Sequence, residues 1–167
     1  MKKAIYLLVI TIVCFCFVSC SAGVNMQTLL RYQEAEGTEF SLCIHDGEQT
    51  FEASLAIGKE DLMLTFADGE RAGIAYRQKR ADGSLSVCMG DFEIPIPETE
   101  RAKCMAWFAL FSLSAEGSPW KIKKQKPGGI DVFVCRSDSV TLYVDAAEYF
   151  PLRIVSEDIT IDICGRK

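Results

Sequence analysis

From residue 38 onward, apolar and polar residues alternate with a period of two along most of the chain. Phe40, Leu42 and Ile44, for example, are each followed by a smaller or more polar residue. Such alternation is typical of β-strands that bury one face. It predicts strands at 40–45, 51–57, 62–66, 74–76, 85–89, 92–96, 120–123, 130–135, 140–144, 152–155 and 159–163. Asp-Gly pairs follow the first, third and fourth of these segments and favour tight hairpins, so we expect an antiparallel meander. Pro95 and Pro97 limit the sixth strand to an edge or a strand end.

Residues 98–114 have a different pattern, which predicts a helix. The segment begins with acidic residues after Pro97, as a helix N-terminus does. Every residue from 104 to 111 is apolar, and the bulky ones are Met105, Trp107, Phe108, Leu110 and Phe111. A helix that is apolar on all sides is buried on most of them, and this one is too short to span a bilayer. We therefore expect an α+β fold in which a strongly curved antiparallel sheet, a half-barrel, wraps a central apolar helix. A shorter helix is expected at 26–36, capped by Asn25.

The N-terminus has the pattern of an export signal. Two Lys follow Met1, residues 4–18 are uncharged and largely apolar, and Ser19-Cys20 ends the stretch. The stretch is shorter than the roughly 20 residues of a spanning helix and has the length of a signal-peptide core. A small residue before Cys resembles the bacterial lipobox, in which the Cys is acylated and becomes the mature N-terminus. The alternative is an uncleaved anchor helix. We expect three regions: a signal peptide at 1–19, a lipidated Cys20 with a tether and short helix at 20–37, and one domain at 38–164.

Charge narrows the classes of partner. The chain has 18 Lys and Arg against 23 Asp and Glu, for a net charge of −5. The first 19 residues hold two Lys and no acidic residue, so the rest of the chain is more acidic still. Nucleic-acid binding depends mainly on phosphate neutralisation by Lys and Arg, so we expect no nucleic-acid partner.

Five cysteines follow Cys20, and their spacing argues against a metal site. They are Cys43, Cys88, Cys104, Cys135 and Cys164. None forms a Cys-x-x-Cys pair and the chain has a single His, whereas structural zinc sites need ligands at short spacing. An odd number cannot pair completely within one chain. We expect mostly reduced, buried thiols, with one disulfide between neighbouring strands as the alternative.

Short motifs near the C-terminus resemble the lipoprotein-carrier (LolA/LolB-like) superfamily. The strand at 140–144 ends in Asp145, and Pro151-Leu152-Arg153 opens the next strand after a short turn. With Phe51-Glu52-Ala53 and the strand–helix–strand order, the layout over most of 38–164 is also similar to small clostridial lipoproteins, including one needed for spore germination. The resemblance implies a curved sheet with helices in its hollow. Bulky helix side chains that fill this hollow would favour protein binding over the carriage of acyl chains.

Candidate functional residues each have a plain structural interpretation as well. His45 is expected to face solvent beside a turn, without a nucleophile or paired carboxylate that the sequence can place next to it. Four bulky side chains of the expected helix have two interpretations: they line an apolar pocket, or they simply form part of the core. They are Met105, Trp107, Phe108 and Phe111. The sequence has one basic cluster, formed by Lys121, Lys123, Lys124 and Lys126. We expect these residues either to contact lipid headgroups or a partner, or simply to protect an edge strand.

These patterns favour a non-enzymatic lipoprotein of the cell envelope. We expect acylated Cys20 to hold it on the extracytoplasmic side of the membrane, where its sheet binds or scaffolds another envelope protein. No catalytic residue, metal or cofactor is expected, because the sequence has no motif for an activated nucleophile or a phosphate-binding loop. The alternative is a carrier or sensor of a lipid or other apolar ligand in the hollow between sheet and helix. A continuous apolar cavity of about 300 Å³ or more would favour the carrier.

Overall fold

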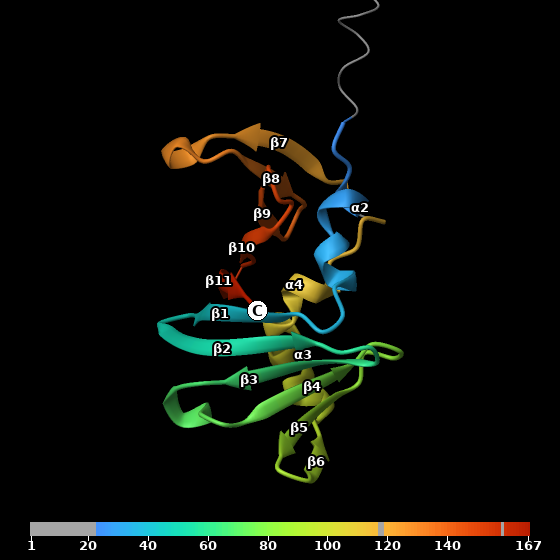
Figure 1. Ribbon diagram of the computed structural model, residues 1–167. Coiled ribbons are helices and arrows are strands. Elements are labelled where there is room, and N and C mark those ends of the chain that lie inside the picture. Colours follow the sequence, from blue (N-terminus) through green and yellow to red (C-terminus); the bar gives the residue numbers. More distant parts are fainter. Residues whose placement is uncertain (1–22, 117–118, 158) are drawn as a thin grey trace, which may run out of the picture.

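Eleven strands form one open antiparallel sheet, and every predicted strand is present. A computed structural model describes residues 23–116, 119–157 and 159–167. The strands are β1 (Glu39–Asp46), β2 (Gln49–Ile57), β3 (Asp61–Phe66), β4 (Ala75–Lys79), β5 (Leu85–Met89), β6 (Phe92–Pro95), β7 (Lys121–Gln125), β8 (Val132–Arg136), β9 (Thr141–Asp145), β10 (Pro151–Val155) and β11 (Ile159–Arg166). Their order across the sheet is β6-β5-β4-β3-β2-β1-β11-β10-β9-β8-β7 (Figure 1). The predicted antiparallel sheet is confirmed.

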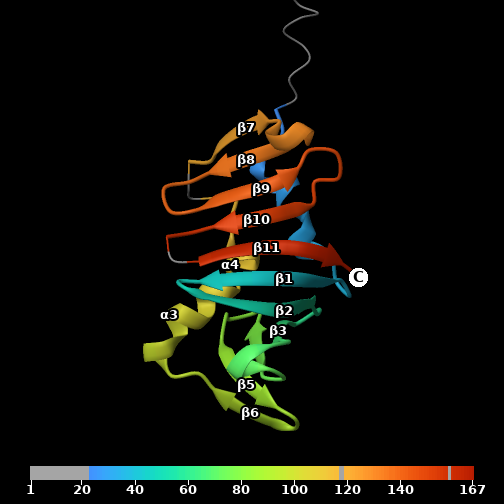
Figure 2. The same ribbon diagram turned by 90° about the vertical axis from the view of Figure 1, so that its left-hand side faces the viewer.

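Two meanders meet at the pairing of the first strand with the last. Strands β1 to β6 run outward in one direction and β11 back to β7 in the other, so β1 and β11 lie at the centre (Figure 2). The register pairs Phe40 with Arg166 and His45 with Thr160, and it shifts between Ser41 and Leu42. Strands β6 and β7 are therefore the two edges, at opposite ends of the sheet. As the proline pattern predicts, β6 is an edge.

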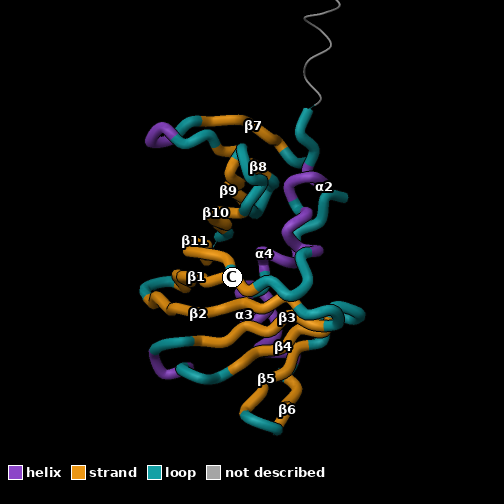
Figure 3. The backbone as a smooth tube through the Cα atoms, viewed as in Figure 1, coloured by secondary structure: helices purple, strands orange, loops and turns teal. Residues whose placement is uncertain are grey.

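The helices lie on one face of the sheet (Figures 1 and 3). They are α2 (Met26–Leu29), α3 (Glu98–Trp107) and α4 (Ala109–Ser112), with a 3-10 turn at Arg31–Glu34 after α2. Asn25 caps α2 as predicted, since its side chain accepts a hydrogen bond from the Thr28 backbone N–H at 2.8 Å. None of the helices in the described part of the chain is long and apolar enough to cross a membrane.

The predicted helix at 98–114 is interrupted, which corrects its expected length. Phe108 has φ −93° and ψ 9°, and its N–H bonds to the carbonyl of Met105, three residues back, at 3.0 Å. The axis therefore changes direction between α3 and α4. This break lets three large groups close together in the chain, Trp107, Phe108 and Leu110, all point into the core, where they are 0–2% exposed. One straight helix would turn part of this set away from the sheet. Met105 and Phe111 stay half-buried.

Aromatic side chains fill the space between helices and sheet. Phe40 on β1 contacts Phe111 and Phe150, with ring centroids 5.6 and 5.8 Å away. Tyr32 packs on the same Phe40, and its hydroxyl donates a 2.7 Å hydrogen bond to the Leu110 carbonyl. This buried bond, together with one from the Gln33 side-chain amide at 3.2 Å, satisfies a carbonyl in α4 that the short helix leaves without an intrahelical partner. The centre of the hollow is thus packed with side chains.

Candidate functional site

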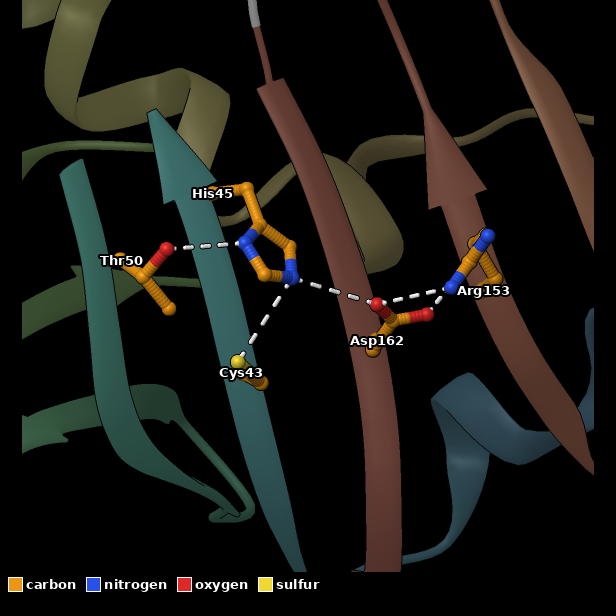
Figure 4. Close-up of polar contacts among 5 residues, drawn as sticks. All are labelled: Cys43, His45, Thr50, Arg153 and Asp162. Carbon is orange, nitrogen blue, oxygen red and sulfur yellow. Dashed lines mark hydrogen bonds and ion pairs between the residues drawn. The ribbon is translucent and has the colours of Figure 1, made fainter. Parts of the chain in front are cut away.

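His45 lies in a polar cluster on the sheet face opposite the helices. Since Phe40, Leu42 and Ile44 are buried beneath the helices, the alternate residues Cys43 and His45 lie on the other face. The His45 Nδ1 is 3.0 Å from the Thr50 hydroxyl on β2, and its Nε2 is 3.6 Å from the Cys43 sulfur (Figure 4).

Asp162 on β11 completes the cluster. One of its carboxylate oxygens is 3.3 Å from the His45 Nε2. The same carboxylate receives two hydrogen bonds from Arg153 on β10, one of them from Nη2 at 3.0 Å (Figure 4). Four neighbouring strands, β2, β1, β11 and β10, are therefore joined by polar side chains across the middle of the sheet.

The cluster does not have the arrangement of a Cys–His nucleophile. Burial raises the pKa of the Cys43 thiol, and nearby Cys164, Asp162, Glu52 and Asp68 raise it further because negative charge disfavours a thiolate. A reactive cysteine needs the opposite environment. In addition, Asp162 is near the same ring nitrogen that faces the sulfur, so it does not orient His45 from the other nitrogen, as the carboxylate of a triad does. No group of three or more possible metal ligands comes together among the described residues.

Three of the four predicted basic residues lie on the edge strand β7, and Lys126 follows it directly. All four, Lys121, Lys123, Lys124 and Lys126, are exposed. Lys124 forms a 2.9 Å ion pair with Asp131, and Lys126 lies 3.9 Å from the same carboxylate. This pairing lowers the pKa of Asp131. Lys121 and Lys123 form no ion pair with a described residue, so they leave unneutralised positive charge along this edge.

The opposite edge is apolar. The hairpin of β5 and β6 exposes Met89, Phe92 and Ile94, with exposed fractions of 48%, 75% and 51%. Phe92 pairs with Met89 and Ile94 with Val87, so the three exposed side chains and Val87 lie on one face of the hairpin. The alternation in the sequence predicted the strand β6. It did not predict that the apolar side chains of β6 would lie beyond the helices and remain exposed.

Two cavities border α3, and they differ in character. One, of about 850 Å³, opens at the ends of β1, β10 and β11 and has polar and charged walls, including Asp46 paired with Lys103 at 3.6 Å. The other, of about 300 Å³, lies between α3 and β4 to β6. We call it the Arg71–Trp107 pocket. Its walls include Trp107, whereas Phe108 is fully buried in the core and Phe111 borders a separate, smaller hollow. The four predicted pocket residues are therefore not brought together in one cavity.

The thiols differ in burial. All five cysteines after Cys20 are free. Cys104 and Cys135 are buried and Cys43 and Cys88 half-buried, but Cys164 is exposed. The expected burial is thus wrong for Cys164, because the alternation along β11 places it on the outer face with Asp162. Cys20 itself and the rest of the proposed signal lie outside the described residues.

Comparison with known proteins identifies the fold. No family profile and no curated protein sequence matches the chain. Among solved structures, the crystal structure of MucB aligns with a TM-score of 0.51 and 11% identity, over 83% of this chain and 55% of MucB. The chain shares its fold with MucB. At 11% identity this likeness shows the fold alone.

Two further structures are more distant. The MucA/MucB complex of Pseudomonas aeruginosa aligns with a TM-score of 0.47 and 11% identity, over 83% of this chain and 54% of that one. The Mycobacterium tuberculosis lipoprotein LppX aligns at 0.41 and 9% identity, over 86% of this chain and 95% of LppX. Since the chain spans only about 55% of the length of MucB, the alignment covers one part of that protein.

Proposed function

We propose that this protein is a non-enzymatic lipoprotein of the cell envelope that binds another envelope protein at the free edge of β6. The observation that carries the proposal is the exposed apolar face of the β5–β6 hairpin, formed by Met89, Phe92 and Ile94. Clustered apolar side chains on a surface are typical of interaction sites. An edge strand also has unpaired backbone N–H and C=O groups, to which an extended segment of a partner can add as a further strand.

The contrast between the two edges supports this assignment. Strand β7 carries Lys121, Lys123 and Lys124, and charged side chains of this kind discourage edge-to-edge pairing. Strand β6 has Glu93 as its single charged residue, and Glu93 is held by Arg77 at 2.9 Å and by the Ser86 hydroxyl at 2.6 Å. These contacts draw the carboxylate toward the sheet, and the hydrogen bond from Ser86 together with the charge of Arg77 lowers its pKa. The β6 edge therefore lacks the free charged side chains of β7, and its protection is limited to its short length and Pro95.

The position of the N-terminal segment fits an anchor at Cys20. The described chain begins beside α2 at the β7 end of the sheet, and β6 lies at the far end (Figures 1 and 2). Acyl chains on Cys20 would hold the β7 end near the membrane, where Lys121 and Lys123 can contact anionic headgroups. The apolar edge would then point away from the bilayer, toward other envelope proteins.

Protein binding is compatible with this fold. MucB, which shares it, occurs in a complex with MucA. The carrier alternative needs an apolar hollow between a curved half-barrel and a central helix, as the sequence suggests. Phe40, Phe108 and Leu110 fill the middle of that space and are completely buried. Packing of this kind favours docking over carriage of a long acyl chain, and the Arg71–Trp107 pocket, at about 300 Å³, leaves room only for a small ligand.

Site-specific photo-crosslinking in intact cells tests the proposal. A photoreactive residue replaces either Phe92 on β6 or, as a matched control, Ile130, which is 60% exposed near the other edge. We expect a single protein adduct from position 92 and none from position 130. A Met89→Glu change, which adds a charge beside the docking strand, should abolish the adduct while the melting temperature stays unchanged. Equal adducts from both positions, or adducts with lipid alone, would contradict docking at β6.

A further inference from the structure

The start of the described chain and the edge strand β7 lie at the same end of the sheet (Figures 1 and 2). Cys20, the proposed attachment site of the lipid, precedes Gly23 by three residues. Three residues of fully extended chain span at most about 11 Å. In the anchored protein proposed above, the β7 end therefore lies close to the membrane surface.

This end of the sheet is basic, although the chain as a whole is acidic. Residues 120–136 contain four Lys and one Arg against one acidic residue, Asp131, which is a formal charge of +4, whereas the whole chain has a net charge of −5. Asp131 is already paired with Lys124 at 2.9 Å. Lys121 and Lys123 are exposed and lie along the edge itself. Positive side chains next to a bilayer are attracted to anionic headgroups over a short distance, which a Debye length limits.

Large apolar side chains are exposed at this end too. Five such residues are exposed in the described chain, and the two outside the β5–β6 hairpin are Ile130 and Tyr149, at 60% and 39%. Ile130 closes a tight turn after β7, in which its N–H donates to the Pro127 carbonyl at 3.1 Å. Gly128 and Gly129 form the turn with φ of 58° and 90°, values that glycine adopts readily. The turn therefore holds the Ile130 side chain out from the sheet.

Tyr149 lies on the loop beside this turn. The Ala146 N–H donates to the Asp131 carbonyl at 3.0 Å, which joins the loop between β9 and β10 to the segment after β7. The Tyr149 ring is parallel to that of Phe133, with centroids 6.1 Å apart, so it is held at the surface. A Tyr ring with a polar hydroxyl is typical of the boundary between a membrane and water.

We infer that the β7 edge and the turn at Ile130 form a membrane-contact surface for anionic phospholipids. Lys121 and Lys123 bind the headgroups, and Ile130 inserts among the acyl chains below them. The inference rests on the acyl anchor at Cys20 in the proposed function, but not on docking at β6. An acyl anchor alone leaves the attached domain free to rotate. A second contact at β7 fixes its orientation, so that β6 is presented away from the bilayer.

Quenching of tryptophan fluorescence by brominated lipid tests the inference. The acylated protein is reconstituted in vesicles of phosphatidylglycerol and brominated phosphatidylcholine. Ile130→Trp places a probe in the turn, Phe92→Trp places one at the opposite edge, and the wild type gives the signal of Trp107 and Trp120. We expect the added fluorescence at 130 to be quenched at least about twofold more than that at 92, because only an inserted side chain meets the bromine atoms. Equal quenching at both positions would overturn the inference.

The lipid class is tested with vesicles that lack phosphatidylglycerol. Quenching at 130 should fall at least about twofold there, and also in high salt, because headgroup charge holds the edge in place. Equal quenching in neutral and anionic vesicles would overturn the assignment to anionic lipid.

A pair of double variants separates the β7 edge from net charge. Lys121→Gln with Lys123→Gln should lower quenching at 130, whereas Lys59→Gln with Lys79→Gln removes the same charge from exposed positions elsewhere and should leave it unchanged. Equal losses in the two would overturn the role of the edge. Flotation with neutral vesicles reports the anchor separately. A protein without acylated Cys20 does not float, whereas failure of this inference leaves a floating protein whose residue 130 is not quenched.

Discussion

His45 and Asp162 lie 3.3 Å apart across the pairing of β1 with β11, which closes the sheet between the two meanders. Asp162 also binds Arg153 on β10, so one carboxylate contacts side chains on both neighbouring strands. These side chains are partly exposed, and ion pairs in such positions contribute about 0–1 kcal/mol. The cluster therefore adds little to stability.

A double-mutant cycle between Arg153 and Asp162 measures this contribution. Asp162→Asn removes the charge that faces Arg153 and His45, and it should lower the free energy of unfolding by about 1 kcal/mol or less. We expect the coupling energy with Arg153→Gln to be below about 1 kcal/mol and to shrink in high salt, because screening weakens exposed pairs. Urea denaturation gives both values. A coupling several times larger would instead indicate a specialised site at this cluster.

Tyr32 provides a second prediction, for stability against pH. Its buried hydroxyl donates to the Leu110 carbonyl, and burial raises the pKa of Tyr32 far above its ordinary value of 10.0. Tyr32→Phe removes this donor while the Gln33 amide still donates to the same carbonyl at 3.2 Å, so it should cost about 0.5–1.5 kcal/mol near neutral pH. Tyr149→Phe, at an exposed position, is the control and should cost little.

The sign of the pH effect follows from the raised pKa. The contribution of Tyr32 is complete below pH 10 and decreases above it, because the unfolded chain then releases a proton that the folded chain retains. The stability difference between wild type and Tyr32→Phe should therefore narrow as the pH rises above 10. A difference that widens in urea denaturation at alkaline pH would contradict this assignment.

The local sequence pattern was sufficient to predict the strands, but not the side-chain contacts that form when the strands pair. The alternation that begins at Phe40 places Cys43 and His45 on the same face of the strand. Residues adjacent in the sequence are sufficient for this prediction. It does not show that β11 is the partner of β1, so Asp162 beside His45 could not be foreseen. The break at Phe108 was missed for a similar reason. An unbroken apolar run favours one helix, whereas packing of Trp107 and Phe108 against the sheet decides where the axis turns.

Arg71 illustrates a tertiary contact that the sequence does not reveal. It lies in a short 3-10 turn (Gly69–Arg71) with no periodic pattern, between two strands. Its position over Phe51, Phe66 and Trp107 depends on three separate elements that meet only in the folded chain. An isolated Arg in a loop is ordinarily solvated, so nothing in the sequence distinguishes this one.

The membrane anchor is tested by mass spectrometry of the membrane fraction. We expect the mature N-terminus to be an acylated Cys20, because a small residue and Cys follow the apolar stretch. Cys20→Ala should release the protein from the membrane or leave its precursor uncleaved, since the acyl chains would be lost. Cys16→Ala is the matched control and should be processed normally. An unchanged membrane anchor in Cys20→Ala would show that the N-terminus is an uncleaved helix.

Thiol labelling provides the last prediction, because the five free cysteines differ in exposure and acidity. Cys164 is exposed and should react within minutes with iodoacetamide at pH 8, whereas buried Cys104 and Cys135 should react only after denaturation. Burial raises the pKa of Cys135 to about 11, so the reactive thiolate is scarce there even where the reagent can enter. Cys43 should react more slowly than Cys164, because its own pKa is raised by burial and by neighbouring negative charge.

Peptide mass spectrometry resolves each site, and Cys164→Ser should abolish the fast phase. Rapid labelling of Cys104 or Cys135 in the native protein would show that the core between helices and sheet opens far more readily than its packing indicates.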